Sequence, residues 1–119
     1  SPCKTALKRK KNMNAFAELH TQISALITTM PASFDTHDFI EKFSHTHQHA
    51  YIQALHEQIT KHPDNDNPYQ QIHALIGKML KSDYAHLVKE IVDEQDAPVK
   101  SKSKDTFGNL TSCALWGKI

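Results

Sequence analysis

Apolar and polar residues alternate with a helical period over much of this chain. Between Asn14 and Met30 the apolar residues recur every three or four positions, at Phe16, Leu19, Ile23, Leu26, Ile27 and Met30. That spacing places them on one face of an amphipathic helix. Pro31 disfavours a further helical turn. The pattern therefore predicts a helix over residues 14–30 and then a connector with a few extended residues around Phe34.

Residues 34–61 predict two helices in close succession, around which the rest of the chain is organised. Asp35 or Thr36 can cap the first, which is expected to end near Phe43 and to bury Phe39, Ile40 and Phe43. Ser44 marks a break. The second is expected to reach about Thr60, with Tyr51 beside an inner face of Ile52, Leu55 and Ile59. Two short helices cannot bury these faces on each other alone, so the flanking segments should cover them.

The second half of the chain predicts two more helices and a different ending. The turn formers at 62–68 end the preceding helix, Asn67 can cap the next one, and Pro68 suits its first position. The inner face of this fourth helix is Tyr69, Ile72, Leu75, Ile76, Met79 and Leu80. A fifth helix is predicted after Ser82 or Asp83, with an inner face of Tyr84, Leu87, Val88, Ile91 and Val92. The last residues alternate as in a short strand or an extended segment, with a final helical turn as the alternative.

These elements predict one mainly α domain of five helices with a short C-terminal strand or extended tail. With 119 residues, the chain is long enough for one domain and too short for two ordinary ones. Four parts are expected: a flexible basic arm (1–12), a helical core domain (13–92), a flexible polar loop (93–105), and a C-terminal segment that packs back on the core (106–119).

Composition narrows the functional classes. A formal net charge of +1 gives no global attraction to nucleic acid, yet lysines crowd the first dozen residues and residues 100–104. Arg9 is the only arginine, which argues against base-specific reading of DNA. Two cysteines at opposite ends, Cys3 and Cys113, form neither a disulfide framework nor a zinc motif. No segment approaches the length of a membrane span, so a cytoplasmic protein is expected.

The two successive helices at 36–61 resemble the helix-turn-helix and winged-helix DNA-binding domains, with residues 98–119 in the position of a wing. The resemblance rests on the spacing of Phe39, Ile40 and Phe43, the break at Ser44, and then Ile52, Leu55 and Ile59. In such domains the second helix of the pair enters the major groove. The resemblance implies that Gln53 reads bases and that phosphates meet the arm, the helix and the loop. The implied nucleic-acid-binding residues are Lys8, Arg9, Lys10, Lys11, His45, Thr46, His49, Gln53, Lys61, Lys100, Lys102 and Lys104.

The sequence contains little that indicates metal binding or catalysis. His45 and His49 lie four residues apart and could share an ion on a helix, but a third ligand such as His37 would have to come from elsewhere. A solvated polar edge is the preferred interpretation, so no metal site is predicted. No nucleophile, base and acid stand in a recognisable context, and three glycines form no phosphate loop. We predict no enzymatic activity, no cofactor and no small-molecule substrate.

The sequence therefore predicts a non-catalytic binding domain, with nucleic acid as the preferred partner. The alternative is a small helical protein-interaction module, such as an adaptor, immunity or antitoxin-like protein, that binds a protein partner or a second copy of itself. An exposed apolar helical face without a basic surface would favour this alternative.

Overall fold

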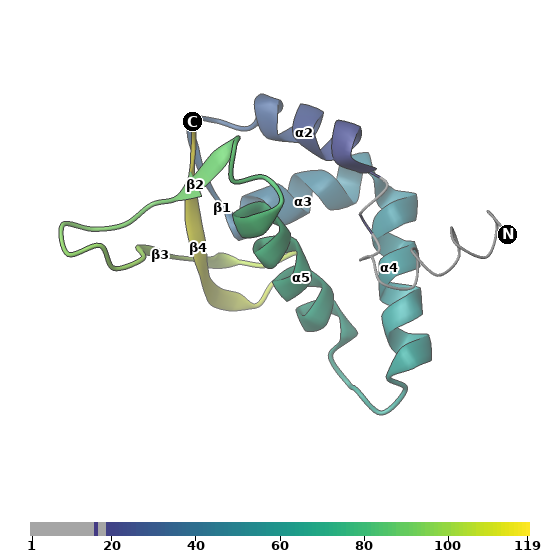
Figure 1. Ribbon diagram of the computed structural model, residues 1–119. Coiled ribbons are helices and arrows are strands. Elements are labelled where there is room, and N and C mark those ends of the chain that lie inside the picture. Colours follow the sequence, from purple (N-terminus) through teal and green to yellow (C-terminus); the bar gives the residue numbers. More distant parts are fainter. Residues whose placement is uncertain (1–15, 17–18) are drawn as a thin grey trace, which may run out of the picture.

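The computed structural model describes residues 16 and 19–119, and over these residues the protein is an α+β fold (Figure 1). Four helices and a four-stranded antiparallel sheet make up the described part of the chain. The prediction of a mainly α domain with five helices is therefore wrong. The elements in order are α2 (His20–Thr29), β1 (Ser33–Asp35), α3 (Thr36–Thr46), α4 (Gln48–Lys61), α5 (Pro68–Ser82), β2 (Val88–Glu90), β3 (Lys100–Lys104) and β4 (Leu110–Lys118).

Strand β4 is the centre of the sheet. Its C-terminal half lies between β1 and β2, with Phe34 and Glu90 both opposite Trp116. Its N-terminal half pairs with β3 over five residues, from Lys100 opposite Ala114 to Lys104 opposite Leu110. Strands β3 and β4 thus form a hairpin, and the loop between β2 and β3 projects from the sheet (Figure 1).

Two segments differ from the sequence prediction because pairing with β4 overrides their local pattern. Residues 83–92 have apolar residues at helical spacing, yet they form a turn followed by β2. Val88 is β-branched, as are Ile91 and Val92 beyond β2, and such residues fit an extended strand better than a helix. The expected polar loop at 93–105 contains β3, whose sequence KSKSK has no apolar residue to signal a strand.

The helix boundaries follow from capping. Asp35 caps α3: its carboxylate accepts a hydrogen bond from the Asp38 N–H at 2.7 Å, and the Asp38 carboxylate accepts one from the Asp35 N–H at 3.3 Å. The break between α3 and α4 falls at His47 rather than at the expected Ser44. Pro68 occupies the start of α5 as predicted, although the Asn67 side chain makes no capping bond.

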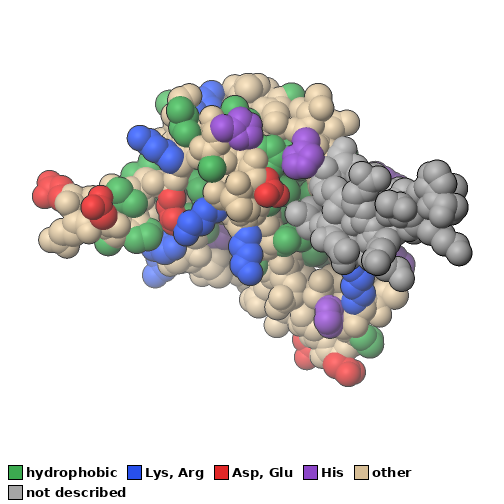
Figure 2. Space-filling model, in the orientation of Figure 1, with side chains coloured by type: hydrophobic (Ala, Val, Ile, Leu, Met, Phe, Trp, Pro, Cys, Tyr) green, Lys and Arg blue, Asp and Glu red, His purple; other side chains and the backbone are tan. Residues whose placement is uncertain are grey.

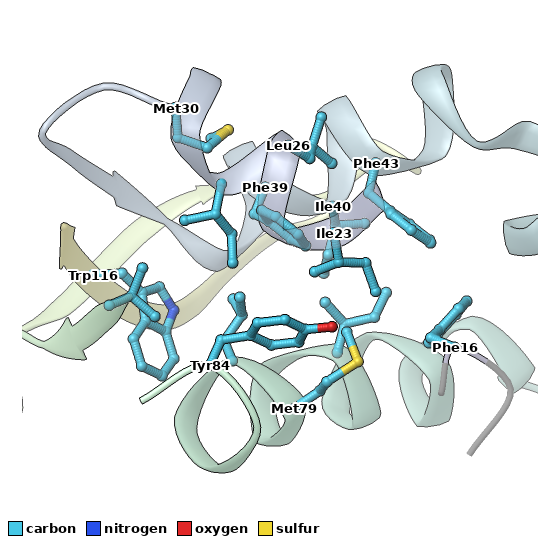
Figure 3. Close-up of a cluster of buried hydrophobic side chains, with 14 of the residues drawn as sticks. Phe16, Ile23, Leu26, Met30, Phe39, Ile40, Phe43, Met79, Tyr84 and Trp116 are labelled. Atoms are coloured by element: carbon cyan, nitrogen blue, oxygen red, sulfur yellow. The ribbon is translucent and has the colours of Figure 1, made fainter. Parts of the chain in front are cut away.

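The core lies between the sheet and helices α2, α3 and α5. Phe16 packs edge-on against Phe43 with their ring centroids 5.0 Å apart, and both are fully buried. Figure 3 shows Met79 and Tyr84 facing the side chains of α2 and α3 across this core. Trp116 is 2% exposed, and its Nε1–H donates to the Thr36 Oγ1 at 2.9 Å, which fixes β4 against the start of α3.

Helix α4 buries a different face from the one the sequence predicts. Tyr51 and Ala54 are its buried residues, whereas Ile52 is 61% exposed and Ile59 is 50% exposed. Leu55 is only partly buried. The expected inner face is therefore wrong. The reason is that α4 lies at the edge of the molecule and contacts α3 and α5 along one side, so that its second apolar stripe has no described segment over it (Figure 1).

Candidate functional site

The candidate site is built on the β3–β4 hairpin, which a buried carboxylate anchors to α3. Asp35 is 5% exposed, and one of its carboxylate oxygens, Oδ2, accepts hydrogen bonds from Ser101 Oγ at 2.7 Å and Ser103 Oγ at 2.8 Å. Burial by itself would raise the pKa of Asp35, but the hydrogen bonds from Asp38, Ser101 and Ser103 outweigh it, and the pKa lies below its usual range. The carboxylate is therefore charged and satisfied at neutral pH.

His37 extends this network to β4. Its Nδ1 lies 2.8 Å from Ser103 Oγ, and its Nε2 lies 3.1 Å from Thr111 Oγ1. Because the Ser103 hydroxyl donates to Asp35, it can accept from His37 Nδ1–H, which leaves Nε2 to accept from Thr111. Serine, histidine and aspartate thus meet in one cluster, but the carboxylate contacts the serine instead of the imidazole. These hydrogen bonds join β3 and β4 to the start of α3, so the network holds the hairpin in place.

Cys113 lies beside this network, partly buried on β4. Burial raises the pKa of its thiol, with hydrogen bonds from the His37 and Thr36 backbone acting in the opposite direction. A thiol with a raised pKa carries little thiolate at neutral pH.

The same anchoring turns the lysines of β3 outward. Successive side chains of a strand point to opposite faces, and Ser101 and Ser103 point to Asp35. Lys100, Lys102 and Lys104 therefore project from the opposite face, and all three are exposed. Lys102 and Lys104 form no ion pair with any carboxylate in the described part of the chain. These two lysines therefore carry free positive charges on this face.

Helix α5 adds two lysines to this row. The Glu90 carboxylate lies 3.9 Å from the Nζ of both Lys81 and Lys100, and so brings the end of α5 beside β3. Lys78 is exposed one turn before Lys81 on α5. We call this set the lysine face: Lys78, Lys81, Lys100, Lys102 and Lys104. Figure 2 shows lysine side chains over the centre and left of the molecule, with single carboxylates between them.

Aromatic rings gather at the end of the hairpin. Phe107, in the turn between β3 and β4, has its ring centroid 4.5 Å from that of Tyr69 and 6.1 Å from that of His73. His73 in turn lies 5.9 Å from Tyr51, whose hydroxyl is 2.6 Å from His73 Nε2. Phe107 is nevertheless 54% exposed. We call this set the aromatic cluster: Tyr51, Tyr69, His73 and Phe107.

The residues that the sequence assigned to nucleic acid fall into three groups. Lys100, Lys102 and Lys104 lie together on β3. The helical set lies at the end of α3 and along α4, on the opposite side of α5 from β3 (Figure 1), and consists of His45, Thr46, His49, Gln53 and Lys61. The arm residues Lys8, Arg9, Lys10 and Lys11 lie outside the described residues.

Sequence reasoning missed Lys78, Lys81 and the aromatic cluster. The lysines of α5 stand on its outer face, and only the pairing of β2 and β3 with β4 brings them beside β3. For β3 itself, the alternation of lysine and serine at 100–104 indicates a strand with two different polar faces, even though it lacks the apolar residues that usually mark a strand.

The histidines do not assemble into a metal site in the part of the chain that the structure describes. His45 and His49 are exposed, whereas His37 is buried at the start of α3 in its bonds to Ser103 and Thr111. Over residues 16 and 19–119, no three histidine, cysteine, aspartate or glutamate side chains lie close enough to hold an ion.

Two further observations reach beyond the site. No helix among the described residues has the length and apolar content needed to cross a membrane. Comparison with protein-family models, with curated proteins and with solved structures finds no match to this sequence or fold.

Proposed function

We propose that this protein is a non-catalytic nucleic-acid-binding domain that contacts phosphates through the lysine face. The observation that carries the proposal is the row of Lys100, Lys102 and Lys104 on one face of β3, joined to Lys78 and Lys81 of α5. Lysine ammonium groups neutralise phosphates and release their counterions, which drives binding without base contacts. Alternate residues of a strand lie about 6.8 Å apart, so each lysine can meet a phosphate of its own.

The order of elements supports the same surface. Residues 83–92 form a turn and β2 instead of a helix, so that α5 lies between α4 and β3, and α4 reaches the hairpin at its turn, where the Tyr51 hydroxyl lies 3.5 Å from Thr106 Oγ1. Residues 98–119, which the sequence resemblance put in the position of a wing, contain both strands of that hairpin. In this proposal α5 takes the place that the sequence had assigned to α4. Helix α4 is less suited, because its outer side carries Ile52 and Ile59 and one lysine, Lys61.

The test compares two double variants that remove the same charge. Fluorescence anisotropy with labelled DNA of about 20 nucleotides, single-stranded or duplex, measures affinity over a range of salt concentrations. Lys102→Ala/Lys104→Ala is expected to weaken binding several-fold and to lower the slope of log affinity against log salt by about one for each phosphate that the variant leaves unneutralised. Lys42→Ala/Lys61→Ala, on α3 and α4, is expected to bind like the wild type.

Two outcomes would contradict the proposal. One is an affinity that does not change with salt, since phosphate contacts necessarily release counterions. The other is an equal loss in both double variants, which would mean that overall charge matters and the lysine face does not. A loss confined to Lys42→Ala/Lys61→Ala would return the binding surface to α4.

A protein-interaction module is the second candidate, and the exposed stripe on α4 favours it. Ile52 and Ile59 lie seven residues apart on the outer side of this helix, with the partly buried Leu55 between them. The neighbouring Gln53 is exposed and carries no charge, so it does not repel a second copy of the chain. Isoleucine and leucine at this spacing are typical of the seam between two packed helices.

A further inference from the structure

We infer that Phe107 stacks on an unpaired base, so that the protein binds single-stranded nucleic acid in preference to duplex. This inference rests on the proposed function, because the lysine face supplies the phosphate contacts that bring the strand to the ring. It deepens that function by specifying the class of ligand.

The first support is the position of the ring. Lys100, Lys102 and Lys104 run along β3 toward the turn, and Phe107 follows three residues after Lys104. A nucleic-acid backbone that follows the row of lysines is led to the end of the hairpin. At that end the Phe107 ring is 54% exposed.

The second support is that the ring is held in place before any ligand arrives. The Asp105 Oδ1 accepts hydrogen bonds from the Phe107 N–H at 2.8 Å and the Asn109 N–H at 3.0 Å, and Gly108 supplies the positive φ of 84° that the turn requires. Tyr69 backs the Phe107 ring at 4.5 Å and is itself held by the Asn109 side-chain amide, whose Nδ2 donates to the Tyr69 hydroxyl at 3.2 Å. An ordered ring loses little entropy when a base stacks on it.

The third support is the charge of the surroundings. Burial lowers the pKa of His73 to about 4, so this member of the aromatic cluster is neutral at pH 7. The Asp105 carboxylate points into the turn between β3 and β4, where it accepts hydrogen bonds from the Phe107 and Asn109 N–H groups. The exposed part of the Phe107 ring therefore offers an apolar surface, which suits the flat face of a base and not a phosphate.

The preference for unpaired bases follows from geometry. In a duplex the flat faces of the bases are covered by their neighbours in the stack, and a ring on a protein surface meets only the edges and the backbone. In a single strand each base can turn outward and stack on an aromatic side chain. The chain's single arginine, Arg9, also limits the reading of base edges in a groove.

The experiment uses the full chain, with substitutions at Phe107 and at a neighbouring control position. The probes are an oligothymidine, an oligouridine and a mixed-sequence duplex of equal length, each followed by fluorescence anisotropy. Phe107→Leu, which keeps apolar bulk but removes the ring, is expected to lose roughly tenfold affinity for the single strands and to bind the duplex within about twofold of the wild type. Leu110→Ala is expected to bind all three probes like the wild type.

A second variant keeps the inference testable even if Phe107→Leu disturbs the turn. Phe107→Trp retains an aromatic ring, is expected to keep single-strand affinity, and should show quenched tryptophan emission when a base stacks on it. Trp116 is buried and is expected to contribute a constant background. Tight binding of either oligothymidine or oligouridine supports the inference.

The outcomes separate this inference from the function it rests on. If the wild type binds no probe, or if Lys102→Ala/Lys104→Ala binds as tightly as the wild type, the proposed function fails and the stacking inference fails with it. If the lysine variant weakens binding but Phe107→Leu loses no single-strand affinity, or loses single-strand and duplex affinity equally, only the stacking inference is overturned. Unquenched emission from bound Phe107→Trp overturns it as well.

Discussion

The residues around His73 determine its protonation state. It lies against the rings of Tyr51, Tyr69 and Phe107, and burial lowers its pKa to about 4, with His37 acting in the same direction and Asp105 opposing. The neutral imidazole can then accept the hydrogen bond from the Tyr51 hydroxyl at 2.6 Å. A histidine that the sequence leaves unremarkable on the face of a helix is thus the neutral centre of the aromatic cluster.

The pH dependence of stability should report the lowered pKa of His73. In the folded protein His73 stays neutral down to about pH 4, whereas in the unfolded chain it gains a proton near pH 6.5. Between these values the unfolded state binds more protons, so the free energy of unfolding falls as the pH is lowered from about 6.5 to 4. Urea unfolding of His73→Gln at several pH values should show a shallower slope of the free energy of unfolding against pH, with the difference corresponding to up to about one proton.

His56→Gln provides the matched control, since His56 is an exposed histidine on α4. This variant should keep the pH dependence of the wild type. Equal pH profiles for His73→Gln and the wild type would contradict a buried, neutral His73.

At the scale of elements, the hairpin depends on contacts that local sequence does not encode. Helices α3 and α5 could be predicted because their signals are local: the Asp35 cap, Pro68, and apolar residues at helical spacing. The position of β3 could not, because its two serines find their partner in Asp35, 66 and 68 residues away. Residues 83–92 were misassigned for a related reason, since one apolar pattern fits both a helix and a turn that leads into a strand.

Removal of the two serine hydroxyls tests this anchor. In Ser101→Ala/Ser103→Ala the buried Asp35 carboxylate loses two of its hydrogen-bond donors, and we expect the free energy of unfolding to fall by roughly 2–4 kcal/mol. Ser33→Ala/Ser112→Ala removes two exposed serines from the same sheet and should stay within about 0.5 kcal/mol of the wild type. Similar losses in the two double variants, measured by urea unfolding, would rule out the anchor.

At the scale of the whole molecule, α4 is the element whose surroundings the sequence misjudged. It has apolar residues on two sides, and the sequence alone cannot say which side meets the core. The stripe with Ile52, Leu55 and Ile59 is the more regular, yet Tyr51 and Ala54 are the residues that pack inside. Part of the candidate site, the lysines of β3, was predicted from composition, whereas the link to α5 depends on the sheet.

The exposed stripe predicts weak self-association. Two isoleucines and a partly buried leucine make a small interface, so a dimer should form only at high protein concentration. Sedimentation over a range of concentrations should show the wild type associating and Ile52→Ser/Ile59→Ser remaining monomeric. The substitutions lie on the surface, so the variant should unfold within about 0.5 kcal/mol of the wild type. A wild type that stays monomeric at every concentration would exclude this use of α4.

The arrangement of the sheet around β4 has one more consequence. Strands β1, β2 and β3 are each hydrogen-bonded to β4, while β2 and β3 are linked to each other beyond their ends by the bridge between Val92 and Pro98. Strand β4 is thus the shared partner of all three other strands. If β4 detaches, all three partners lose their ladder in the same event, so this half of the molecule should open and close as one cooperative unit.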